Sequence, residues 1–217
     1  MSTLLCQLDI AFAVAPIPRW DDRDTLTTLA DRHLVGEERR LFALLRSDKR
    51  RAAFLAGRIA AKKLLIAPPF SFSTTATEIG RRSSGAPYIK GMATPTLSIS
   101  HTDGIAVAVA AAKEAIGIDI ETDVRRDAAL ITYFFSQGEK QLLNGLEEPS
   151  RSALANVLWT RKEAAAKVGE WGGALVFRHL DCSHDHTVID NRRIRLKSAS
   201  LGGFVASIAI EEETVHG

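Results

Sequence analysis

One short run limits what this chain can fold into: residues 115–121, Ala-Ile-Gly-Ile-Asp-Ile-Glu. An apolar lead-in followed by strict alternation after Gly117 predicts a half-buried β-strand. The side-chain period of two then places Asp119 and Glu121 on the same face of that strand. Neighbouring carboxylates repel each other unless a cation lies between them, and magnesium is the usual cation for hard oxygen ligands. The run therefore predicts a strand that carries a candidate magnesium site.

A second run, residues 159–167, reads Trp-Thr-Arg-Lys-Glu-Ala-Ala-Ala-Lys. Good helix formers throughout predict a helix, with Glu163 and Lys167 one turn apart. Taken alone, an Asp-x-Glu strand is most often a solvated face, and a Glu four residues before a Lys is most often a surface ion pair. Together the two runs supply three carboxylates and a lysine that can join in one site.

Size and composition predict a globular cytoplasmic protein. The 217 residues suffice for one large domain or two small ones, and 46% hydrophobic residues are ample for a core. No apolar run approaches the length needed to cross a bilayer, and Met1–Asp9 has neither a basic n-region nor a cleavage site, so no membrane partner is expected. Cys6 and Cys182 suggest reduced structural thiols rather than a disulfide framework.

The formal charge of +2 is unevenly distributed along the chain. Seven basic residues fall in one stretch: Arg46, Lys49, Arg50, Arg51, Arg58, Lys62 and Lys63. Nucleic acid is one partner for such a patch, but interleaved aromatic residues and a recognised reading motif are missing. A phosphorylated small molecule or an acidic protein suits the patch at least as well.

The patterning predicts alternating groups of helices and strands. We expect strands over Leu5–Val14, Leu97–Ser100, Ile105–Ala111, Ala115–Glu121, Ala174–Cys182, Val188–Ser198 and Phe204–Ile210. We expect helices over Asp21–Leu34, Gly36–Leu45, Ser47–Ile66, Ala128–Phe135, Ser136–Leu146 and Arg151–Lys167. The strands from residue 97 to 121 would form an antiparallel meander, and residues 70–96 would be loop-rich.

The order of these elements suggests two similar α+β lobes, residues 1–112 and 113–217, with a ligand between them. A weak repeat supports this reading, because Ile105–Ala110 and Phe204–Ala209 look like equivalent strands. The His, Cys and Asp residues between His179 and His186 also suit zinc, but a hydrophilic turn explains them better since no second ligand pair stands at finger-like spacing.

In combination, Gly-Ile-Asp-Ile-Glu and Trp-Thr-Arg-Lys-Glu-Ala-Ala-Ala-Lys resemble the signature of the 4′-phosphopantetheinyl transferases, specifically the surfactin-synthetase-activating type. Three further stretches resemble elements of that family. Residues 85–88, Gly-Ala-Pro-Tyr, look like its Gly-Lys-Pro turn, although Ala86 stands where the family often has a basic residue. Residues 98–101, Ser-Ile-Ser-His, look like its Ser-x-Ser-His element, and Phe134-Phe135-Ser136 with Glu139 matches a recurrent family stretch.

The resemblance implies a fold, a reaction and roles for particular residues. The fold would be a pseudo-dimer of two lobes, with coenzyme A in the cleft and its phosphopantetheine arm passing to a serine of an apo acyl or peptidyl carrier protein. Asp119, Glu121 and Glu163 would hold Mg²⁺, with Mn²⁺ as an alternative. Glu163 would also be the base, and Lys167 would neutralise the leaving 3′,5′-ADP. The other coenzyme A contacts would come from Arg50 or Arg51, and from Arg58, Gly85, Pro87, Ser100, His101 and Lys162.

Two other classes of function stay open at this point. A non-catalytic coenzyme A or nucleotide-binding module would keep the pocket, yet binding alone would not need Asp119, Glu121, Glu163 and Lys167 together. A nucleic-acid binder would use the basic stretch and show a steep salt dependence. We expect a monomer that serves secondary metabolism without binding nucleic acid, while the carrier protein, the pathway and the tolerance for acylated coenzyme A are left undecided.

Overall fold

The computed structural model describes residues 10–73, 77–169 and 177–212. The chain divides into two compact units, Ile10–Lys113 and a second that begins at Glu114. We call them the N-terminal and the C-terminal unit. Each combines helices with antiparallel strands, which confirms the predicted mixture of α and β structure. None of the helices in the described ranges is both long and apolar enough to cross a membrane.

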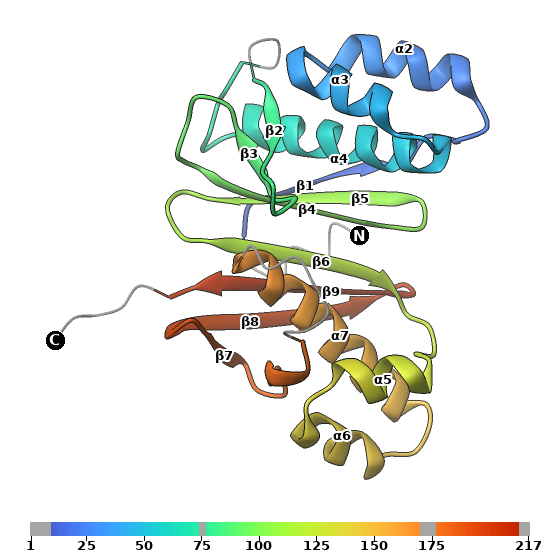
Figure 1. Cartoon of the computed structure of the whole chain (residues 1–217), viewed down its shortest axis with the longest axis vertical. Coiled ribbons are helices and arrows are strands. Elements are labelled where there is room, and N and C mark those ends of the chain that lie inside the picture. The colour runs from blue at the N-terminus through green and yellow to red at the C-terminus, as the bar shows by residue number, and fades with distance from the viewer. Residues whose placement is uncertain (1–9, 74–76, 170–176, 213–217) are drawn as a thin grey trace, which may run out of the picture. The chain divides into compact units, whose positions relative to one another are not determined.

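The N-terminal unit has a three-stranded sheet with the order β1-β5-β4, and α4 packs along it (Figure 1). A two-stranded hairpin, β2-β3, is separate from that sheet. In chain order the elements are β1 (Phe12–Pro16), α2 (Arg23–His33), α3 (Gly36–Leu44), α4 (Asp48–Ile66), β2 (Ile79–Arg81), β3 (Pro87–Ile89), β4 (Thr96–Thr102) and β5 (Ile105–Ala111).

The C-terminal unit has a four-stranded sheet with the order β6-β9-β8-β7, and α7 covers one face of it (Figure 1). A 3₁₀ turn at Phe177–His179 precedes β7. The elements are β6 (Ile116–Thr122), α5 (Ala128–Phe134), α6 (Gln137–Asn144), α7 (Ser150–Val168), β7 (His186–Ile189), β8 (Arg192–Leu201) and β9 (Phe204–Glu211).

The two units follow the same plan. Each begins with a strand, continues through three helices of which the third has 19 residues, and ends in antiparallel strands. In each sheet the first strand pairs with the last strand, and the last pairs with the one before it. The similarity goes beyond the short stretches of matching sequence.

In each unit a buried Glu–Lys ion pair connects the long third helix to the helix before it. In the N-terminal unit, Lys62 Nζ on α4 lies 2.6 Å from Glu38 Oε2 at the start of α3. In the C-terminal unit, Lys162 Nζ on α7 lies 2.8 Å from Glu139 Oε2 at the start of α6. Both glutamates are fully buried, and both accept a hydrogen bond from the backbone at the N-cap of their helix. An unpaired charge at such depth is costly, so the two partners must be kept together.

Several predicted strands differ from the observed ones. Ala115–Glu121 does not extend a meander with Ile105–Ala111, because β6 belongs to the other sheet and pairs with β9. Val188–Ser198 is not one strand but the hairpin of β7 and β8, whose turn residues Asp190 and Asn191 have φ angles of 49° and 62°. Asp and Asn tolerate the left-handed region that such a two-residue turn requires.

The loop-rich segment predicted over residues 70–96 contains the hairpin strands β2 and β3, and two further differences lie at the edges of the described ranges. Leu5–Val14 is replaced by Phe12–Pro16, and residues 5–9 lie outside the described residues. Of the strand predicted over residues 174–182, residues 174–176 also lie outside them, and Phe177–His179 forms a 3₁₀ turn. Phe177 is buried against aromatic rings of the helices, which favours a compact turn over an extended strand.

Candidate functional site

The two carboxylates of β6 lie on the face of the sheet that α7 covers. Alternation along the strand puts Ile116, Ile118 and Ile120 on one face, where all three are buried. Asp119 and Glu121 follow on the opposite face, with Asp119 directly across from Ser207 of β9. The predicted pairing of the two carboxylates on one side of a strand is therefore observed.

At Gly117 the backbone of α7 lies directly against β6. A Cβ atom built on Gly117 would lie 1.9 Å from the backbone oxygen of Ala164 and 3.2 Å from the Cβ of Lys167. No residue with a side chain fits there, because the obstacle is backbone rather than a movable side chain. The glycine of the first motif thus allows the helix of the second motif to lie directly on the strand.

This contact brings Lys167 against the first motif. Its ammonium donates to Asp119 Oδ1 and to the backbone oxygen of Ile118, both over 2.8 Å. Asp119 is only 5% exposed. A charge-assisted hydrogen bond at this depth holds the carboxylate in a fixed orientation.

Glu121 has two partners from other elements. Arg126 Nη2, in the segment that follows β6, lies 3.7 Å from Glu121 Oε2. A side-chain hydrogen bond from Trp159 on α7 lowers the pKa of Glu121, as does the charge of Arg126. Burial and the nearby Asp119 outweigh both effects, so the pKa of Glu121 is raised.

Glu163 is the most strongly perturbed carboxylate of the site. Burial, followed by the charges of Asp119 and then Glu121, raises its pKa to about 7, while Lys167 and Arg126 act in the opposite direction. Two carboxylates can raise the pKa of a third only when they are close to it. The charges of Asp119 and Glu121 therefore act on Glu163, so the three acidic residues from two distant runs are electrostatically coupled.

The donor chemistry of these residues fits a divalent cation. Three carboxylates supply hard oxygen ligands, and the pKa values of Glu121 and Glu163 are raised by burial first and by the charge of Asp119 second, a repulsion that a dication would relieve. Within residues 10–73, 77–169 and 177–212, however, no three His, Cys, Asp or Glu side chains are grouped as metal ligands would be. Asp119 and Glu121 instead each face a basic side chain, Lys167 and Arg126.

Comparison with known families shows to which superfamily the chain belongs. A family model described as the 4′-phosphopantetheinyl transferase superfamily matches residues 115–209, from β6 into β9. A second, described as the 4′-phosphopantetheinyl transferase N-terminal domain, matches residues 38–111. The chain belongs to the 4′-phosphopantetheinyl transferase superfamily. Both carboxylate-bearing motifs lie inside the first match.

One solved structure similar to this superfamily member is the holo-[acyl-carrier-protein] synthase of Thermotoga maritima. The two share 14% sequence identity with a TM-score of 0.35, over 46% of this chain and 63% of the other. The chain thus matches less than two thirds of the length of that neighbour. No curated protein matches the chain.

Lys162 of this transferase-superfamily chain has other partners than the predicted phosphates. It is fully buried, and its ammonium contacts Glu139 Oε2 and the backbone oxygens of Phe177 and Leu180. Consecutive residues of a helix point about 100° apart, so Lys162 and Glu163 leave α7 in different directions. Lys162 has no exposed surface from which to reach a ligand, and its role here is to join α7 to α6.

Polar residues that the sequence analysis missed connect α7 to the strands β8 and β9. Thr160 and Ser207 share a hydrogen bond of 2.7 Å, Ser207 and Ser198 share one of 2.8 Å, and Arg161 Nε donates to Ser198 over 2.9 Å. Both Thr160 and Ser207 are fully buried. The serine within the apolar run of β9, Phe-Val-Ala-Ser-Ile-Ala-Ile, was the available signal, because a buried hydroxyl needs a partner.

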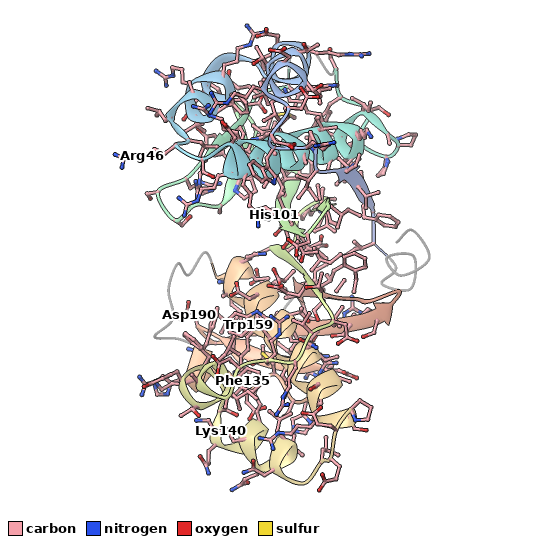
Figure 2. The ribbon with its side chains drawn as sticks, turned by 90° about the vertical axis from the view of Figure 1, so that its right-hand side faces the viewer. Arg46, His101, Phe135, Lys140, Trp159 and Asp190 are labelled. Atoms are coloured by element: carbon pink, nitrogen blue, oxygen red, sulfur yellow. The ribbon has the colours of Figure 1, made fainter. Side chains whose placement is uncertain are left out.

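Trp159 belongs to an aromatic cluster in the C-terminal unit and is labelled in Figure 2. Its ring meets those of Phe134 and Phe177 edge-on, with both centroid distances at 5.6 Å. Its ring packs within this cluster, and its side chain also bonds to Glu121. The cluster thereby anchors a residue that holds one carboxylate of the site.

The remaining predicted ligands lie in the N-terminal unit. Arg58 on α4 is only 6% exposed and 3.8 Å from Glu38 Oε1, and its guanidinium stacks over Phe54 at 4.5 Å. Burial, together with the like charge of Arg81, lowers its pKa to about 10. Arg50 is exposed, whereas Arg51 pairs with Asp48 over 3.1 Å.

Gly85 and Pro87 lie in the β2-β3 hairpin, and Ser100 and His101 lie on β4. Gly85 has a φ of 92°, and its backbone oxygen accepts a bond from Arg81 Nε over 3.3 Å. Ser100 is buried, and His101, which Figure 2 labels, is exposed. Adjacent strand residues point to opposite faces, so the side chains of Ser100 and His101 serve different sides of this sheet.

Proposed function

We propose that this protein is a magnesium-dependent 4′-phosphopantetheinyl transferase of the surfactin-synthetase-activating type. It would transfer the phosphopantetheine arm of coenzyme A to a serine of an apo acyl or peptidyl carrier protein and release 3′,5′-ADP. The single observation that carries the proposal is the contact at Gly117, where α7 lies against β6 and Lys167 bonds to Asp119. Membership in the superfamily supports it independently.

The metal would be held by Asp119, Glu121 and Glu163. A bound Mg²⁺ or Mn²⁺ would offset the charge that develops on the pyrophosphate oxygens of coenzyme A. The charge excess at these carboxylates, expressed in the pKa of about 7 for Glu163, is the feature of the site that favours such an ion.

The proton transfer would be carried out by Glu163. The pKa of about 7 holds without a bound cation, and a dication at these carboxylates would lower it. The ionised Glu163 would accept the proton of the carrier serine, directly or through a water. The serine oxygen then forms a bond to the β-phosphorus of coenzyme A, and the bond from that phosphorus to the bridging oxygen breaks. The bond's electron pair leaves with 3′,5′-ADP, whose charge Lys167 would neutralise.

The nucleotide end of coenzyme A would bind an N-terminal lobe at residues 1–112, and the metal would bind a second lobe at residues 113–217. Arg58 supports this role, because its buried guanidinium is repelled by the charge of Arg81, and an anion such as the 3′-phosphate would offset that repulsion. Arg50 or Arg51, Gly85, Pro87, Ser100 and His101 would complete the contacts. The shared element order of the units supports a pseudo-dimer of two lobes, and we expect a cytoplasmic monomer.

Mass spectrometry tests the proposal. The protein is incubated with an apo carrier protein, coenzyme A and Mg²⁺, and the mass of phosphopantetheine is sought on the carrier serine. Asp119→Ala and Glu163→Ala should reduce transfer by orders of magnitude, whereas Glu147→Ala, an exposed acidic residue of the same unit, should not. Binding of coenzyme A without any transfer would identify a non-catalytic module instead, and near-normal transfer by Glu163→Ala would refute the assigned site.

A further inference from the structure

Arg126 lies in the segment after β6, and its guanidinium turns back toward that strand. Its Nη2 atom is 3.7 Å from Glu121 Oε2, and the side chain is only 11% exposed. That separation lies within ion-pair range but exceeds a hydrogen bond, and Nη2 makes no hydrogen bond within the described part of the chain. Arg126 therefore acts on Glu121 through its charge rather than through a directed bond.

Asn156 holds Arg126 in this place. Arg126 Nε donates to Asn156 Oδ1 over 2.5 Å, and Asn156 Nδ2 donates to Asp123 Oδ1 over 2.6 Å and to the backbone oxygen of Val124 over 2.8 Å. Asn156 is fully buried on α7. An amide fixes the guanidinium without neutralising it, so the full positive charge remains available to the carboxylates.

Two basic residues face different carboxylates of the site. Lys167 bonds directly to Asp119, whereas Arg126 faces Glu121, so each carboxylate of β6 has a cation of its own. Both cations also lower the pKa of Glu163. With separate cations, the charges of the three carboxylates act on one another, yet within the described residues they are not grouped as the ligands of one metal ion would be.

We infer that Arg126, anchored by Asn156, is the counter-ion of Glu121 and competes with a divalent cation for that carboxylate. The inference rests on the proposed function, since it needs a cation that binds to the three carboxylates. Arg126 is thus a positioning residue that acts through Glu121. Removing its charge has two opposite effects: repulsion among the carboxylates grows when no cation is bound, and a dication binds more tightly because nothing competes with it.

The test compares Arg126→Gln with Arg125→Gln. Arg125 is the preceding residue, but its side chain is 84% exposed and lies 3.9 Å from Glu148. Affinity for Mn²⁺ is measured by electron paramagnetic resonance, and melting temperature is measured in EDTA. Arg126→Gln should melt lower in EDTA and bind Mn²⁺ about three- to tenfold more tightly than wild type. Arg125→Gln should change neither, and Arg126→Lys should keep the Mn²⁺ affinity close to wild type.

Three outcomes would overturn the inference. One is an Arg126→Gln protein that melts cooperatively and binds Mn²⁺ no more tightly than Arg125→Gln. If Arg126→Gln does not fold, Asn156→Ala replaces it and should tighten Mn²⁺ binding to a smaller extent, so unchanged affinity in that variant overturns the inference too. If wild type binds no Mn²⁺, the proposed metal role fails on its own, and equal melting of the two arginine variants in EDTA would then reject the counter-ion.

Discussion

The ammonium of Lys167 donates a hydrogen bond to the carboxylate of Asp119 over 2.8 Å, although the two residues are 48 positions apart in the chain. The same ammonium also bonds to the backbone of β6 at Ile118. Lys167 therefore joins the helix of one motif to the strand of the other. Its side chain is 31% exposed, so it is also accessible to a ligand at the edge of the site.

Substitution of Lys167 by alanine should abolish most transfer with a modest loss of stability. Lys167 is the cation assigned to the leaving 3′,5′-ADP, and loss of one such contact typically costs 10²–10³ in rate, about 3–4 kcal/mol. Rates of transfer and melting temperatures are compared with those of Lys140→Ala, a lysine on α6 outside the site (Figure 2). Equal rates in the two variants would remove Lys167 from the reaction.

Gly117→Ala should destabilise the fold and impair transfer together. The added methyl would lie 1.9 Å from the oxygen of Ala164, so α7 must move away from β6. Overpacking of this kind costs about 1–3 kcal/mol, measured by urea unfolding. Gly145→Ala is the matched control, because its Cβ would meet its nearest neighbour at an ordinary 3.6 Å. A Gly117→Ala protein as stable as that control would contradict the close approach.

Glu163→Gln should raise the melting temperature only at higher pH. In the folded protein the pKa of Glu163 is about 7 against an ordinary 4.5. The stability it contributes is fully present below pH 4.5 and is lost as the pH rises through 7, because the fold disfavours the charged form. Melting in EDTA should be alike for variant and wild type below pH 4.5 and differ by a few degrees above pH 7. A constant difference at all pH values would argue against this pKa.

Lys162→Met should unfold the protein readily rather than act on the reaction. It would leave the fully buried Glu139 without its cation, which costs about 3–5 kcal/mol. The double variant Glu139→Gln with Lys162→Met should recover much of that loss in urea unfolding, because no uncompensated charge remains. A stable Lys162→Met protein with weakened binding of coenzyme A would restore the phosphate role predicted for this lysine.

The sequence was informative wherever a local pattern decided the structure. The apolar runs at Ile105–Ala111 and Phe204–Ile210 predicted the strands β5 and β9, and the helix predicted over Ser136–Leu146 contains α6, which a capping box of Ser136 and Glu139 opens. The pairing of Asp119 with Glu121 on one face also follows from the period of two. These features depend on residues close together in the chain.

Long-range contacts escaped the same reasoning. The partners of Arg126 and Asn156 are fixed by how the segment after β6 crosses α7, and no periodicity records that path. Lys162 was assigned to the site because it adjoins Glu163, but its direction from α7 depends on the place of α6. The hairpin turn at Asp190 and Asn191 did carry a local signal, which the long run of strand formers around it obscured.

The buried Glu–Lys pair recurs in both units, and this repetition makes Lys63 the counterpart of Glu163, since each follows the paired lysine on its helix. The first strands differ in the same sense, because β1 reads Phe-Ala-Val-Ala-Pro where β6 carries two acids. Next to the buried pair the two units therefore carry opposite charges, Lys63 in one and Glu163 in the other. Units with the same order of elements can thus differ in the charge that they place beside a shared ion pair.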